Sequence, residues 1–157
     1  MKVFISHKKE DEDIAKKIHL LLRIKNVASY LDLLDTSIVD DGKALTDHIK
    51  KELNDCTDIM VIMSEKTRFS QWVPFEVGMS AQIDMPTVTY LSEDVLLPSF
   101  LKYWPRLRRP SDVDEYISAR QKTTDRMNII YEHKEFATRK KVEIEMFYSQ
   151  LKSQLGQ

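Results

Sequence analysis

Hydrophobic and polar residues fall in blocks along this chain, and the blocks predict strands and helices in turn. Short, polar-flanked apolar runs rich in β-branched residues are typical of strands buried on both faces of a parallel sheet. Four runs are assigned to strands on this pattern, at residues 2–6, 27–31, 58–63 and 86–91, and residues 107–109 could form a minimal fifth strand before Pro110. Segments with helical periodicity separate or follow them, at residues 11–24, 43–53, 72–79, 96–104 and from 112 onward.

Strands that alternate with helices favour an α/β domain with a parallel sheet. For five strands we expect the flavodoxin-like, three-layer fold, with strand order 2-1-3-4-5 and right-handed crossovers. The domain is predicted over residues 1–125, and residues 126–157 are predicted to form a helical extension packed on it. The extension has one apolar stripe, formed by Ile144, Phe147, Tyr148, Leu151 and Leu155.

The predicted strand order indicates where a ligand would bind. Open α/β sheets hold ligands beyond the carboxyl ends of their strands, at the point where the strand order reverses. Here that point lies between the first and third strands, so residues 6–9 should meet the helix that carries Trp72 and Glu76. Those two side chains are one helical turn apart, on a face that we expect to be exposed. The alternative interpretation is a solvated glutamate beside a tryptophan at the edge of the core.

Charge and composition narrow the possible functions. The net charge of −1 over 157 residues creates no overall field that would attract nucleic acid. The basic run at residues 106–109 is therefore interpreted as a solvated edge. No apolar stretch approaches 20 residues, so no membrane span is expected. The sequence begins directly with a strand, without a signal peptide, and its single cysteine, Cys56, cannot form an internal disulfide. These features predict a cytoplasmic protein.

Several ligand-binding motifs are missing from the sequence. No Gly-x-Gly-x-x-Gly follows the first strand, and Gly42-Lys43 is followed by Ala44 instead of serine or threonine. These features argue against a Rossmann oxidoreductase and a P-loop. The third strand ends in Ser64, not in the aspartate of a phosphoacceptor receiver domain. The four histidines show no metal-ligand spacing.

Five segments, taken together, resemble a Toll/interleukin receptor (TIR) domain, over roughly residues 1–110. They are VFISH (3–7), YLD (30–32), DGK (41–43), IMVIMS (59–64) and SQWVPFE (70–76). The first is similar to free-standing bacterial members of the family. The sequence departs from the pattern at Val73, where cysteine is frequent, and at Lys8 and Lys9, where small residues or arginine are common.

The resemblance implies an enzyme that cleaves the nicotinamide–ribose bond of NAD, with Glu76 as its catalytic residue. NAD would be a substrate, with no separate cofactor or metal. Similarity to free-standing bacterial members implies a cyclic ADP-ribose product that acts in Thoeris-like antiviral defence through a separately encoded effector protein. A non-catalytic TIR scaffold that associates with other TIR domains is the alternative, and a nucleoside deoxyribosyltransferase-like enzyme is a third possibility.

The chemistry of this bond is compatible with one carboxylate. Nicotinamide leaves as a neutral molecule, so the main demand is to stabilise an oxocarbenium-like ribose cation. A carboxylate does this best in a dry pocket. Glu76 would supply the charge, and Trp72 and Phe69 would be apolar walls.

The remaining candidates lie around the same rim. Ser6 and His7 would line the nicotinamide or ribose end, although a packing role for His7 is equally compatible with the sequence. Lys8 and Lys9 could meet the pyrophosphate as point charges or belong to a solvated loop. Asp32 either faces the rim or caps the following loop.

Gly42 is interpreted as a permissive backbone position in the acidic loop after the second strand. In the TIR family, this loop makes contacts between neighbouring domains. The resemblance therefore implies self-association, with Gly42 at or near the contact.

Overall fold

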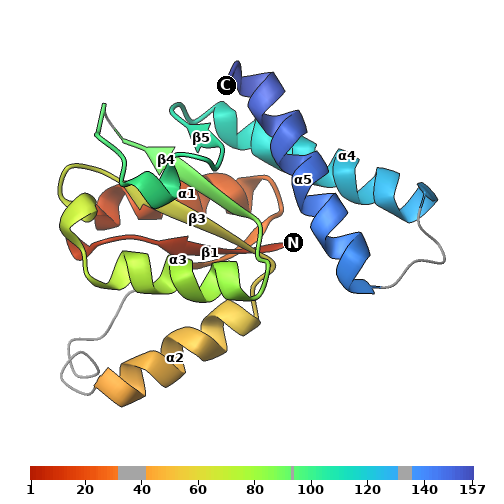
Figure 1. The fold of residues 1–157 in the computed structure, drawn as a ribbon. Helices are drawn as coiled ribbons and strands as arrows, with labels where there is room; N and C mark the ends of the chain where they lie inside the picture. Colours follow the sequence, from red (N-terminus) through yellow and green to blue (C-terminus); the bar gives the residue numbers. More distant parts are fainter. Residues whose placement is uncertain (32–41, 93, 131–135) are drawn as a thin grey trace.

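The computed structural model describes residues 1–31, 42–92, 94–130 and 136–157. Its five parallel strands form one sheet in the order β2-β1-β3-β4-β5. The predicted strand order is confirmed (Figure 1). The strands are β1 (Lys2–Ser6), β2 (Ala28–Leu31), β3 (Asp58–Met63), β4 (Thr87–Leu91) and β5 (Arg106–Leu107).

The helices agree with the periodic segments to within a few residues. They are α1 (Glu12–Ile24), α2 (Gly42–Asn54), α3 (Trp72–Gln82), α4 (Asp112–Ile130) and α5 (Phe136–Leu155). Short 3-10 helices also occur: η1 (Lys9–Asp11), η2 (Thr67–Phe69) and η3 (Ser99–Leu101). The helix predicted at 96–104 contracts to η3, because Pro98 caps its start and Pro105 follows closely.

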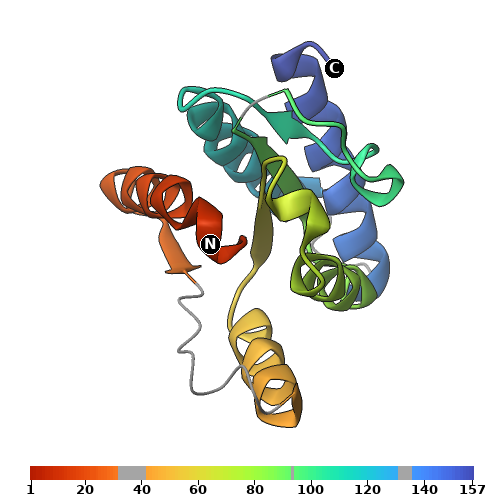
Figure 2. The same ribbon diagram turned by 90° about the vertical axis from the view of Figure 1, so that its left-hand side faces the viewer.

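Helices cover both faces of the sheet, with α1 on one face and α2 and α3 on the other (Figures 1 and 2). Alternate residues of each strand point to opposite faces, so β3 contributes to two core clusters. Met60 and Ile62 pack with side chains of α1 and α4, whereas Ile59 and Val61 pack with those of α2 and α3. All six residues of β3 are buried as a result.

Helix α5 is tied to the edge of the sheet that ends in β5. Two residues of the predicted apolar stripe, Phe147 and Leu151, are completely buried in the cluster that contains α4. The Tyr148 hydroxyl accepts a 2.8 Å hydrogen bond from the Thr87 amide, at the start of β4. The Gln157 side chain also bonds the backbone N–H and C=O of Arg106 in the edge strand β5. The C-terminal helix therefore packs as part of the domain.

A buried ionic cluster fastens α4 to the amino-terminal end of β3. Asp58, completely buried, lies 2.7 Å from the Arg120 guanidinium and 2.9 Å from the Tyr116 hydroxyl. The Thr57 hydroxyl donates to the second carboxylate oxygen, and Arg120 also reaches Glu143 of α5 at 3.4 Å. This cluster joins β3, α4 and α5 at the end of the sheet opposite to the predicted crevice.

Candidate active site

Glu76 lies in the second turn of α3 and is only 3% exposed. The expectation of an exposed helix face at this position is wrong. Helix α3 is apolar along most of its length, and Val73, Val77 and Ser80 beside Glu76 are buried as well. The side chain of Glu76 consequently points toward the end of β1 instead of toward solvent.

Ser6, the last residue of β1, is completely buried and donates a short hydrogen bond from its hydroxyl to the Glu76 carboxylate. The parallel pairing of β1 with β3 sets Ser6 opposite Val61, two residues before β3 ends. The chain then returns through η2 into α3. The predicted meeting of two segments 70 residues apart is therefore confirmed at the atomic level.

The residues that follow Ser6 face different surroundings. His7 is half-buried, with its Nδ1 atom 3.4 Å from the Ile5 carbonyl oxygen. Lys8 forms a 2.9 Å ion pair with Glu10, whose pKa is lowered chiefly by that hydrogen bond. Lys9 is exposed at the start of η1. The charge of Lys8 is therefore already matched within its own loop.

The aromatic candidates differ in exposure. Trp72 begins α3, packs against the core cluster of that face, and forms an edge-to-face contact with Phe75 at 5.7 Å between ring centroids. Phe69 is 73% exposed on η2, with the Arg68 guanidinium 5.1 Å from its ring centre. Trp72 is therefore partly buried against the core, whereas Phe69 projects into solvent.

A second buried carboxylate, Asp11, connects the segments that follow β1 and β3. It accepts hydrogen bonds from the hydroxyls of Ser64, at 2.5 Å, and of Thr67. The Ser64 oxygen in turn accepts from the backbone amides of Lys66 and Thr67. Asp11 therefore joins the segment after β1 to the segment that leads into α3.

The sequence pattern placed Asp11 only at the first residue of the helix predicted at 11–24, and gave no sign of its contact with the segment after β3. The predicted strand order could have indicated this contact, because it places the carboxyl ends of β1 and β3 side by side. An acidic residue after one strand and hydroxyl residues after its neighbour are then natural hydrogen-bond partners.

The two loop candidates have different outcomes. Asp32 lies outside the described residues. Gly42 is exposed at the start of α2, and a Cβ added there would meet nothing within 4 Å. Among described glycines only Gly156 has a positive φ, so the interpretation of Gly42 as a special backbone position is wrong. Helix-initiating geometry is open to most residues.

No group of three or more potential metal-ligating side chains occurs within residues 1–31, 42–92, 94–130 and 136–157. Over the same part of the chain, no helix has the length and apolar character needed to cross a membrane. Two of the histidines have structural partners: His19 bonds Ser29, and His48 bonds Tyr30, each at 2.8 Å. These bonds link α1 and α2 to β2.

Comparison with known proteins identifies the family. The TIR domain family model matches residues 3–130, so the chain belongs to the TIR domain family. Curated protein sequences include no significant match.

Two solved structures share the fold. The TIR domain of the Toll-related receptor TRR-2 from Hydra magnipapillata is 16% identical, with a TM-score of 0.56, over 67% of this chain and 81% of that one. The CMP N-glycosidase BcmB from Clostridium botulinum is 10% identical, with a TM-score of 0.52, over 75% of this chain and 99% of that one.

Proposed function

We propose that this TIR domain is an enzyme that cleaves the nicotinamide–ribose bond of NAD, with Glu76 as the catalytic carboxylate. The observation that carries the proposal is the position of Glu76, which is buried at the switch point of the sheet and bonded to Ser6. Burying a carboxylate away from water costs folding free energy. A scaffold that only associates with other domains has no use for one at this position.

The geometry suits a reaction that develops positive charge on a sugar. As the bond to the pyridinium nitrogen breaks, its electron pair leaves with nicotinamide, and the ribose becomes an oxocarbenium-like cation. Glu76 would stabilise this cation by its negative charge, which acts strongly in a site that excludes water. The Ser6 hydroxyl would orient the carboxylate, because it donates to one of its two oxygens. Water, or a nucleophile on the adenosine end of NAD, then completes the product.

The likeness to an N-glycosidase supports this class of chemistry in a general way. BcmB is described as a CMP N-glycosidase, so a protein with this fold can act on a bond between a sugar and a nitrogen base. NAD contains such a bond. CMP is therefore the natural competitor for NAD in any test of substrate class.

For the product, we propose a cyclic ADP-ribose that acts as a signal in antiviral defence through a separately encoded effector protein. Cyclisation needs a nucleophile of the adenosine end to reach the ribose cation before water does. Trp72, beside the core at the start of α3, would help to exclude that water. We also propose that the domain self-associates and that a neighbouring copy completes the rim of the crevice.

Mass spectrometry of NAD incubated with the purified protein tests the function directly. We expect nicotinamide in amounts equal to a product one water lighter than linear ADP-ribose, at a specific activity that rises with protein concentration. If linear ADP-ribose is the only product, the enzyme is a hydrolase and not a cyclase. Cytosine release from CMP, with NAD untouched, would identify a different substrate. No turnover of either compound at any protein concentration would leave the scaffold as the function.

A further inference from the structure

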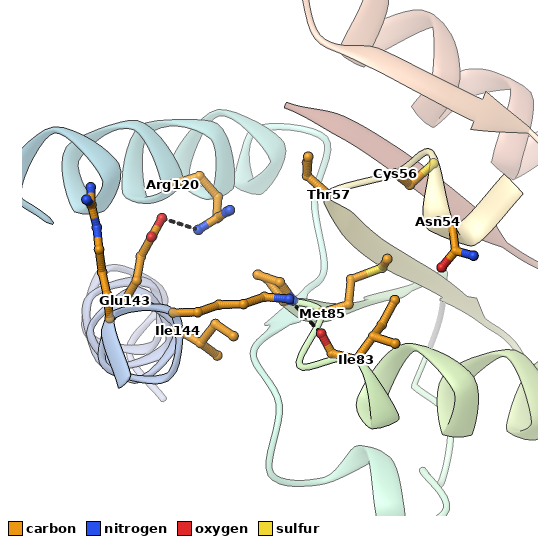
Figure 3. A pocket seen from close by; sticks show the side chains of 11 residues that line it. Asn54, Cys56, Thr57, Ile83, Met85, Arg120, Glu143 and Ile144 are labelled. Carbon is orange, nitrogen blue, oxygen red and sulfur yellow. Dashed lines mark hydrogen bonds and ion pairs between the residues drawn. The ribbon is translucent and has the colours of Figure 1, made fainter. Parts of the chain in front are cut away.

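A pocket of about 570 Å³ lies at the amino-terminal end of the sheet, opposite to Glu76. Four segments that are distant in sequence form it: residues 54–57, from the last residue of α2 to the residue before β3, the connection from α3 to β4, Arg120 of α4, and residues 139–144 of α5. Figure 3 shows Arg120 and Glu143 on the helical side and Asn54, Met85 and Ile83 on the opposite side. Its volume is in the range of pockets that hold small organic ligands.

Three cationic side chains and one carboxylate line this pocket. Arg120 is neutralised, because it pairs with Asp58 at 2.7 Å and with Glu143 at 3.4 Å. The other two cations contact neutral oxygens. Arg139 donates to the Asn128 side-chain carbonyl at 2.5 Å, and Lys140 donates to the Ile83 backbone carbonyl at 2.6 Å.

Within the described part of the chain, neither Arg139 nor Lys140 forms an ion pair. Two adjacent positive charges at a concave surface create a local field that favours an anion. Arginine presents a planar fork that matches phosphate and carboxylate groups, and lysine adds a mobile point charge. Both donors can turn toward a ligand, since their present acceptors carry no charge.

The rest of the lining is largely apolar. Met85 is 5% exposed, and Pro86, Ile83 and Ile144 stand around it. The Cys56 thiol also faces the pocket, and burial raises its pKa to about 11. At neutral pH it is therefore a protonated, unreactive part of the wall. Charged donors beside an apolar floor fit a ligand with an anionic group on an apolar body.

We propose that this pocket binds a small amphipathic anion, with Arg139 and Lys140 on its phosphate or carboxylate and Met85 and Ile144 against its apolar part. The two cations and Ile144 belong to α5, beyond residue 130 where the match to the TIR family model ends. The pocket is also separate from the proposed reaction, which takes place at the other end of the strands.

Binding of three probes at constant ionic strength tests the proposal: phenyl phosphate, benzoate and inorganic phosphate. Constant ionic strength is needed because salt screens exposed charges. We expect calorimetry to show saturable binding of phenyl phosphate or benzoate, and weaker binding of inorganic phosphate. Whichever aromatic probe binds more tightly shows whether the pocket prefers a phosphate or a carboxylate. The methyl resonance of Met85, assigned through Met85→Leu, should shift on binding in the unaltered protein.

Matched double variants locate the site. Arg139→Gln with Lys140→Gln should weaken binding at least about tenfold, the loss expected from a charge-assisted hydrogen bond. The control is Lys122→Gln with Arg126→Gln, which removes the same charge from exposed positions on α4 and should leave binding unchanged. Equal loss in both pairs would overturn the proposal. So would preference for inorganic phosphate, or an unmoved Met85 methyl up to about 10 mM probe.

Discussion

Two buried carboxylates at opposite ends of the sheet have different partners. Asp58, at the amino-terminal end of β3, is matched by the charge of Arg120 and by the hydroxyls of Tyr116 and Thr57. Glu76, beyond the other end of β3, receives a hydrogen bond from the neutral hydroxyl of Ser6. A carboxylate paired with a cation is committed to the fold. The Ser6 hydroxyl orients the Glu76 carboxylate at the end of β1, where we propose that the sugar cation develops.

The electrostatics of the Asp58 end agree with a structural role. Burial and the Asp58 charge raise the pKa of Tyr116 well above its ordinary value, so this hydroxyl remains a donor. Burial acts to lower the pKa of Arg120, but the interactions with Asp58 outweigh it and the net pKa is raised. Both groups therefore keep fixed protonation states over the working pH range.

The strongest test of this contrast is Arg120→Ala, which leaves Asp58 buried without its cation. We expect the free energy of unfolding to fall by about 3–5 kcal/mol, because breaking a buried pair strands a desolvated charge. Denaturant unfolding measures the loss. Specific activity per folded molecule should remain close to that of the unaltered protein.

The control is the double variant Asp58→Asn with Arg120→Met, which removes both charges and should recover much of the lost stability. A loss of less than 1 kcal/mol in the single variant, within the range of surface pairs, would show that the cluster is not structural.

Glu76→Gln tests the other end of the sheet. Glutamine keeps the volume and an acceptor for Ser6 but removes the charge, so turnover of NAD should fall about 10²–10³-fold, or about 2.7–4 kcal/mol. The melting temperature should change little. Glu145→Gln on α5, an exposed position, is the matched control and should keep full activity. A folded Glu76 variant with normal turnover would reverse the assignment.

Asp11→Asn sharpens the comparison. Asp11 is also a buried carboxylate at the Glu76 end of the sheet, but we assign it a positioning role, because it joins the segments that follow β1 and β3. The hydroxyls of Ser64 and Thr67 donate to the same oxygen of Asp11, which asparagine can supply. The negative charge that strengthens both bonds is lost, so we expect a stability loss of about 1–3 kcal/mol. The crevice walls should shift, which raises KM for NAD more than it lowers kcat. Steady-state kinetics provide this ratio, and a pure kcat effect would instead assign Asp11 to the chemistry.

Strand order and the meeting of Ser6 with Glu76 could be predicted from sequence because both depend on repeated patterns. The run at residues 59–63 is apolar throughout and follows Asp58, so its strand was predicted with the observed limits, 58–63. Burial of Glu76 could not be predicted, since helical periodicity alone does not show which neighbour covers a given face. Asp11 was missed for a related reason: its partners lie 53 and 56 residues away. The interpretation of Gly42 was wrong because glycine occurs both in turns that need a positive φ and at ordinary helix starts.

The smallest expected effect is a loss of stability in alkali, and it should come from the Asp58 end of the sheet. Burial raises the pKa of Cys56 from 9.0 to about 11 and that of Tyr148 from 10.0 to about 12. The folded state holds these protons more tightly than the unfolded state. Their stabilisation is therefore complete below pH 9 and is lost as pH rises through the folded values.

At pH 10, where mainly Cys56 contributes, the loss relative to pH 8 should be about 1 kcal/mol. Denaturant unfolding at both pH values measures this loss, and Cys56→Ala should remove most of it because alanine has no proton to lose. Glu76→Gln, at the opposite end, should leave the alkaline slope unchanged. A slope that persists in Cys56→Ala would place the titrating group elsewhere. One that vanishes in Glu76→Gln would show that the two ends are coupled.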